Sequence, residues 1–95
     1  MNNEESRVLQ NRLIMERPVN NTIVCCIEEM SELTKVLTKY LRDSHKFSID
    51  SLTEEVAHVL LMVDTMKETF VLNETKINDE ILIALQKCFP PKEEK

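Results

Sequence analysis

Two short stretches of the sequence carry the residues that could do chemistry. Residues 28–32 read EEMSE and residues 54–58 read EEVAH, so each stretch opens with two glutamates. Each then has a further polar residue three positions after the second glutamate. Carboxylate and imidazole groups bind divalent cations and transfer protons. The two stretches therefore indicate a metal site, provided that the fold brings them together.

Helical geometry gives both stretches the same arrangement of side chains. Successive residues of an α-helix are rotated by about 100°, which places Glu32 about 60° from Glu29 and His58 about 60° from Glu55. In both stretches, apolar residues that a helix would bury surround the polar pair. Two such helices packed antiparallel would direct both pairs into one space. The expected site consists of Glu29, Glu32, Glu55 and His58.

A cation would explain why carboxylates gather beside an apolar stripe. Such carboxylates are partly desolvated and repel one another, and a divalent cation offsets both effects. Oxygen ligands suit Mg²⁺ or Mn²⁺. Charged residues three or four positions apart are also common on solvated helices. The spacing alone therefore leaves an ordinary pair of amphipathic helices as the alternative.

The elements that must position these residues are predicted to be helices. The chain has 95 residues, no glycine and 4% aromatic residues, a composition typical of a single all-α domain over 1–95. Apolar periodicity predicts a four-helix protomer with two long antiparallel central helices. A linker at 43–50 and a solvated tail at 90–95 complete the chain. The four helices are expected at roughly 4–16, 20–42, 51–71 and 78–89.

Several details of these helices can also be predicted. Apolar residues at helical spacing, such as Ile27, Leu37 and Val56, are expected to face the core. Ser51 and Glu54 have the spacing of a capping box at the start of the third helix, with Asp50 as an alternative cap. The stretch LNETKIN, 72–78, is expected to interrupt the helical pattern.

Composition also restricts the partners. The net charge of −5 argues against a general nucleic-acid binder, which would present a basic face. The longest apolar run, VLLMV, is far too short to cross a membrane, and the polar, acidic N-terminus does not resemble a signal peptide. Three cysteines, two of them adjacent, fit small buried residues in a reducing cytoplasm. Because so short a chain buries little surface, self-association is expected.

The two stretches resemble the motifs of the MazG-like nucleoside triphosphate pyrophosphohydrolases, the all-α NTP pyrophosphatase superfamily. That family carries E-E-x-x-E on one helix and E-x-x-D on the next. Residues 28–32 match the first motif, and 55–58 match the second except that His58 replaces the final aspartate. The resemblance covers roughly 20–70, including the apolar pattern around both motifs.

The resemblance implies a specific activity. Members of the family use Mg²⁺ to hydrolyse nucleoside triphosphates to a monophosphate and pyrophosphate, which maintains the nucleotide pool, and they form dimers or tetramers. By position, Glu28 would be the catalytic, water-positioning carboxylate. The metal ligands would be Glu29, Glu32, Glu55 and His58.

His58 is the departure from the family pattern. An imidazole suits Mn²⁺ or another softer metal better than Mg²⁺. The chain could therefore use fewer ligands, prefer Mn²⁺, or have kept the fold without catalysis. Lys35, Lys39 and Arg42 follow the first motif and could reach phosphates of the substrate, although such residues are also common on solvated faces.

Two other functions fit the same residues. Glu55-x-x-His58 has the spacing of a ligand pair in di-iron carboxylate bundles, in which a dimer would supply two copies. The chain could also be a catalytically inactive helical interaction module. Iron binding would favour the di-iron protein and pyrophosphate release would favour the hydrolase, whereas the inactive module would show neither.

Overall fold

The computed structural model describes residues 3–91, and within them all regular structure is helical. This confirms the all-α class and the four predicted helices. Residues 92–95 of the predicted tail lie outside the described range. The elements are α1 (Glu4–Glu16), α2 (Val19–Arg42), the 3₁₀ turn η1 (Ser44–Lys46), α3 (Ile49–Thr69) and α4 (Glu74–Cys88).

Side-chain caps fix where three of the helices begin. Asn3 Oδ1 accepts hydrogen bonds from the first backbone amides of α1. Ser48 Oγ accepts from the Ser51 amide at 3.2 Å, so the cap of α3 is Ser48 and the predicted caps at Ser51 and Asp50 are wrong. Asn73 Oδ1 accepts from the Lys76 amide at 3.0 Å. Most of the stretch predicted to interrupt the pattern is therefore the first turn of α4.

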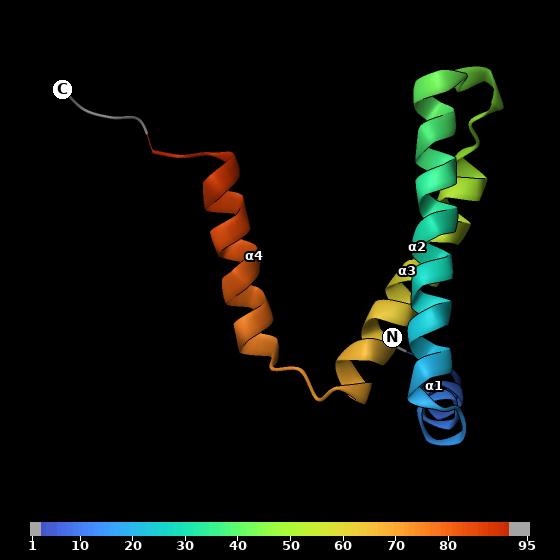
Figure 1. The fold of residues 1–95 in the computed structure, drawn as a ribbon, viewed down its shortest axis with the longest axis vertical. Helices are drawn as coiled ribbons and strands as arrows, with labels where there is room; N and C mark the ends of the chain where they lie inside the picture. The colour runs from blue at the N-terminus through green and yellow to red at the C-terminus, as the bar shows by residue number, and fades with distance from the viewer. Residues whose placement is uncertain (1–2, 92–95) are drawn as a thin grey trace.

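Helices α2 and α3 form the centre of the fold (Figure 1). They lie side by side, and η1 joins them and packs against α2. The rings of Tyr40 and Phe47 meet edge to face at this end, with 5.1 Å between their centroids. At the other end, α1 contacts α3. The long α2–α3 contact is what brings the two glutamate-rich stretches into reach of each other.

The few buried residues include a polar group where α1 meets α3. Gln10 Nε2 donates hydrogen bonds to Asp64 Oδ2 at 2.8 Å and to Thr65 Oγ1 at 3.2 Å, and Thr65 is fully buried. Thr65 Oγ1 in turn donates to the Leu61 carbonyl. Directional bonds of this kind set how α1 lies against α3. The buried residues are Gln10, Thr22, Cys26, Met62 and Thr65.

Most of the apolar residues predicted to face the core are exposed in the single chain. Ile27 and Leu37 on α2, and Val56 on α3, belong to this group. Helical spacing identified the apolar stripes, but within the described residues no element covers them. The expectation that they form the core of one protomer is therefore wrong.

Helix α4 stands apart from the other three helices, as Figure 1 shows, and none of its residues is buried. This separation gives the chain an extended shape. Its radius of gyration is 17.2 Å, whereas a compact chain of this length has about 12 Å. No helix within residues 3–91 is both long and apolar enough to cross a membrane.

The junction between α3 and α4 is a sharp, well-defined turn. The Leu72 amide donates to the Lys67 carbonyl at 2.9 Å and the Val71 amide donates to the Glu68 carbonyl at 3.2 Å, which is the Schellman pattern. Val71 has φ 51°, a conformation that disfavours β-branched residues and that glycine usually supplies. Lys67 also forms an ion pair with Glu74, and the hydrogen bond between the two side chains raises the pKa of Lys67.

Candidate functional site

Three of the four predicted metal ligands come together across the α2–α3 contact. Glu29 projects from α2, and Glu55 and His58 project from α3. His58 Nδ1 lies 3.1 Å from Glu29 Oε2 and 3.9 Å from Glu55 Oε2. One candidate ligand atom from each residue lies within 4.8 Å of the other two. We refer to these three residues as the Glu–Glu–His cluster.

Two carboxylate oxygens of this cluster are buried without a hydrogen bond. Glu29 Oε2 and Glu55 Oε2 have almost no exposed surface, and neither has a hydrogen-bond partner among the described residues. The 3.1 Å separation from His58 Nδ1 is short enough for a hydrogen bond, but its geometry does not make one. Buried, unpaired carboxylate oxygens are costly. A cation or a proton between these groups would remove that cost.

Glu32 is the predicted ligand that lies outside the cluster. Its carboxylate forms an ion pair with Lys35 at 3.2 Å on the exposed surface of α2. An exposed pair of this kind contributes little to stability and is easily exchanged for another partner. Glu32 lies one turn from Glu29, so it borders the cluster without joining it.

A basic hollow lies next to Glu32 at the C-terminal end of α2. It has a volume of about 430 Å³ and includes the three predicted substrate-binding residues, Lys35, Lys39 and Arg42. Lys46 of η1 and Asp43 also line it, and the sequence did not single out either because both fall in the linker. Its four cations and two carboxylates give it a net positive charge in a protein whose overall charge is −5.

Two cations in this basic hollow are available for an anion. Lys35 is paired with Glu32, and Lys46 lies 4.0 Å from Asp43. Lys39 and Arg42, by contrast, form no ion pair with another described residue. A guanidinium and an ammonium group one turn apart suit phosphate oxygens. This hollow is therefore suited to an anionic group.

The predicted catalytic residue, Glu28, is exposed on α2 and lies outside the cluster. By helical geometry it projects about 100° from Glu29, toward the side of α2 that carries Glu32 and Lys39. Its carboxylate therefore lies on the same side as the basic hollow.

The donor set of the cluster fits a divalent cation. Two carboxylates and one imidazole nitrogen suit Mn²⁺, Fe²⁺ or Zn²⁺, whereas Mg²⁺ prefers oxygen ligands alone. The unpaired oxygens of Glu29 and Glu55 are the atoms that such an ion would satisfy. Both the positions and the donor atoms of Glu29, Glu55 and His58 are therefore compatible with a bound divalent cation.

The chain matches no protein-family model, no curated protein and no solved structure.

Proposed function

We propose that the chain is a metal-dependent nucleoside triphosphate pyrophosphohydrolase of the MazG-like kind. The observation that carries the proposal is the Glu–Glu–His cluster, in which ligand atoms from two helices lie within 4.8 Å of one another. The basic hollow on the same helix, α2, gives the phosphates of a substrate a place to bind. The assembly that we propose is a homodimer or homotetramer in which α2 and α3 are the central antiparallel pair.

The residues would divide the work as follows. Glu29, Glu55 and His58 would hold the cation, and Glu32, which is paired with Lys35 in this structure, would supply a further carboxylate beside it. Such a cation neutralises phosphate charge and makes water a better nucleophile. Lys39 and Arg42 bind the outer phosphates, which positions the α-phosphorus for attack by water and the Pα–O bond to the β-phosphate for cleavage, with pyrophosphate as the leaving group. Glu28 accepts a hydrogen bond from the attacking water and holds it in line.

His58 makes Mn²⁺ the favoured ion. An aspartate at this position would add a negative charge and a hard oxygen ligand, both of which favour Mg²⁺. The imidazole supplies neither, and its nitrogen binds Mn²⁺ more strongly than Mg²⁺. Mg²⁺ remains the alternative, held by the carboxylates alone.

The test is pyrophosphate release from a panel of canonical and modified nucleoside triphosphates, with Mg²⁺ and Mn²⁺ compared. We expect one monophosphate and one pyrophosphate per turnover, faster with Mn²⁺. Glu29→Gln and Glu55→Gln should abolish release, while the neighbouring Glu54→Gln should retain it. Release from no nucleotide with either metal would contradict the proposal.

A second function is favoured by the pairing of His58 with Glu55 on α3, in which Nδ1 of the histidine lies 3.9 Å from Oε2 of the glutamate. This pair fits one half of a di-iron carboxylate site completed by a second copy. Aerobic loading with Fe²⁺ distinguishes the two functions. An oxo-iron absorption band together with an absence of pyrophosphate release would favour the iron protein. If neither activity is found, the inactive interaction module remains.

A further inference from the structure

Helix α4 has one broad apolar face that is exposed. Ile81, Leu82 and Leu85 are 53%, 54% and 53% exposed. Because successive residues of a helix are rotated by about 100°, these three side chains fall on one face, whereas Lys76 and Lys87 lie on the opposite side. The apolar face of an amphipathic helix is normally packed against another element. Within the described residues, however, no residue of α4 is buried.

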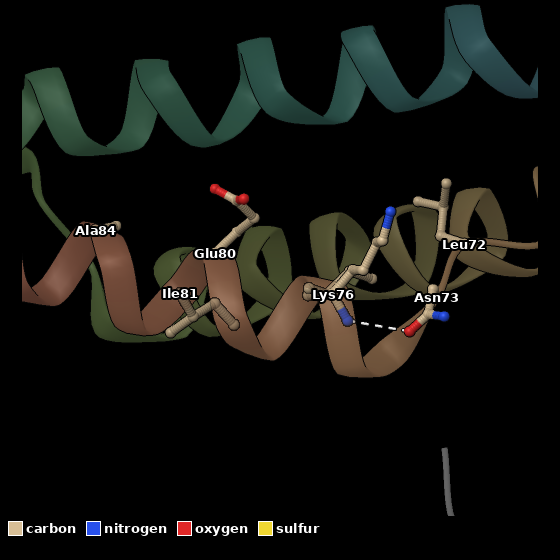
Figure 2. Close-up of a pocket in the computed structure, with 7 residues that line it drawn as sticks. Leu72, Asn73, Lys76, Glu80, Ile81 and Ala84 are labelled. Atoms are coloured by element: carbon tan, nitrogen blue, oxygen red, sulfur yellow. Dashed lines mark hydrogen bonds between the residues drawn. The ribbon is translucent and has the colours of Figure 1, made fainter.

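The surface of α4 includes a shallow, open hollow. A hollow of about 460 Å³ is lined only by residues of α4 and of the segment before it, from Leu72 to Ala84. Figure 2 shows these side chains, with Ile81 on one side of the helix and Glu80 on the other. The described part of the chain supplies no opposite wall. A 15-residue helix without such a wall is only marginally stable in water.

The exposed area indicates what covers α4. The chain exposes 8221 Å², whereas a compact protein of this size exposes about 5,700 Å². The excess of about 2,500 Å² per chain is well above the roughly 800 Å² per partner of a standard interface. It lies in the range of obligate homodimers, whose protomers have no stable folded form alone. A second copy of the chain is therefore the partner that the area favours.

The rest of the chain offers α4 a complementary surface. Exposed apolar residues repeat at helical spacing on α2, as at Ile27 and Met30, and on α3, as at Val56, Leu60 and Val63. If α4 paired only with α4 of another copy, these stripes would stay uncovered. If each α4 instead packs on the unit formed by α1, α2 and α3 of the other copy, which we call the α1–α3 unit, both α4 and these apolar stripes are buried. A twofold axis makes this exchange reciprocal.

The turn between α3 and α4 suits such an exchange. The segment from Phe70 to Asn73 is short, and Val71 occupies a strained left-handed conformation. Short, strained hinges favour the exchange of an element between copies. The Schellman turn directs α4 away from its own α1–α3 unit (Figure 1).

We propose that α4 is an exchanged helix, which packs against the α1–α3 unit of a second copy of this chain. The two copies donate and receive α4 reciprocally. This inference does not depend on the proposed catalysis, because it rests on α4 and on the exposed stripes and not on the Glu–Glu–His cluster.

The first test is the mass of the protein in solution. Sedimentation velocity of the full chain should give a dimer or a larger even assembly. The double variant Ile81→Asp with Leu85→Asp should shift it to a monomer, and Lys87→Gln on the polar side of α4 should leave it unchanged. Circular dichroism of the double variant should retain most of the helical signal of α1–α3. A monomeric wild type at high concentration would overturn the proposal.

The second test distinguishes exchange from pairing of α4 with α4. A variant with Cys25→Ser, Cys88→Ser and Lys87→Cys, which keeps the buried Cys26, carries a spin label on the polar side of α4. It is refolded together with ¹⁵N-labelled chains that have no spin label. Exchange predicts line broadening of α1–α3 amides in the ¹⁵N-labelled chains. Broadening confined to α4 amides, or no broadening between chains, would overturn the proposal.

Discussion

His58 Nδ1 on α3 lies 3.1 Å from Glu29 Oε2 on α2, so the candidate site depends on the register of these two helices. Sliding one helix past the other by a single turn, about 5.4 Å, would separate the two groups. The α2–α3 contact and the η1 turn that closes it therefore act as the scaffold of the site. Substitutions at the ends of α2 or α3 that shift this register would therefore change the distances within the Glu–Glu–His cluster.

Replacing one carboxylate of the cluster should weaken metal binding without unfolding the protein. Glu29→Gln removes a ligand charge, so Mn²⁺ affinity should fall about tenfold or more, by comparison with the 10- to 100-fold losses seen when groups supporting a metal site are changed. Without metal, the variant should be at least as stable as the wild type, because the repulsion with Glu55 is gone. Calorimetric titration and thermal unfolding measure the two effects. Glu54→Gln is the matched control, and equal Mn²⁺ affinity in both variants would show that Glu29 is not a ligand.

Changing the histidine should change the preferred metal. His58→Asp adds a carboxylate, so Mg²⁺-dependent pyrophosphate release should rise and the advantage of Mn²⁺ should shrink. Pyrophosphate-release rates and metal affinities measured with Mg²⁺ and with Mn²⁺ test this expectation. His45→Asp, at the other histidine, is the control, and an identical metal preference in all three proteins would remove His58 from the site.

Cations in the basic hollow should act on substrate binding. Lys39→Ala removes an unpaired ammonium group, so KM for the triphosphate should rise about tenfold, the effect of roughly 1.4 kcal/mol, with a smaller change in kcat. Lys87→Ala, on α4 and far from the hollow in sequence, should leave KM unchanged. Steady-state kinetics at saturating metal separate the two constants. If KM is unaffected by Lys39→Ala, the phosphates bind elsewhere.

Replacing Val71, the residue with a left-handed backbone conformation at the end of α3, should stabilise the protein. Val71→Gly removes an unfavourable conformation that costs a non-glycine residue about 1–2 kcal/mol, although glycine also makes the unfolded chain more flexible, at about 0.5–1 kcal/mol. A net gain of between zero and about 1.5 kcal/mol in the free energy of unfolding is expected. Val71→Asn should gain as well, since asparagine tolerates this region. Urea unfolding measures the change, and destabilisation by both substitutions would show that Val71 is not strained.

The ion pair at the same junction predicts a pH dependence. The pKa of Lys67 is raised by its hydrogen bond to Glu74, so its contribution to stability is fully present below the usual lysine pKa. The contribution is lost as the pH rises through the raised pKa. Glu74→Gln should therefore lower the urea midpoint slightly near neutral pH and have no effect in strong alkali. Glu80→Gln is the control, and a difference that grows with pH would contradict the assignment.

The helices could be predicted from the sequence because apolar spacing and the lack of glycine both favour them. Their starts were harder to place. Asn73 and Ser48 cap α4 and α3, but each stands in a polar stretch that offers several candidate caps. Which of them forms the bond depends on the direction of the incoming chain. The polar contact of Gln10 with Thr65 was not predictable either, because neither residue type signals burial.

The arrangement of the site was partly predictable for the same physical reason. The angular match between the two motifs anticipates that Glu29, Glu55 and His58 share one side of the α2–α3 contact. The angular match does not decide the partner of Glu32, which forms an ion pair with Lys35 and lies outside the cluster. The sequence also cannot say which apolar stripe is covered by the same chain and which by another. That choice depends on the turn at Val71.

The isolated position of α4 has a consequence for the rates at which backbone amides exchange hydrogen with water. Amides of α2 and α3 near Cys26 and Met62 are held by buried packing, so they should open only when the whole unit unfolds. Amides of α4 have no such packing within their own chain and should exchange quickly in dilute solution. As protein concentration rises, protection of α4 should increase while that of the α2–α3 centre changes much less. Two regions of one small chain would thus report different equilibria, one within the protomer and one between protomers.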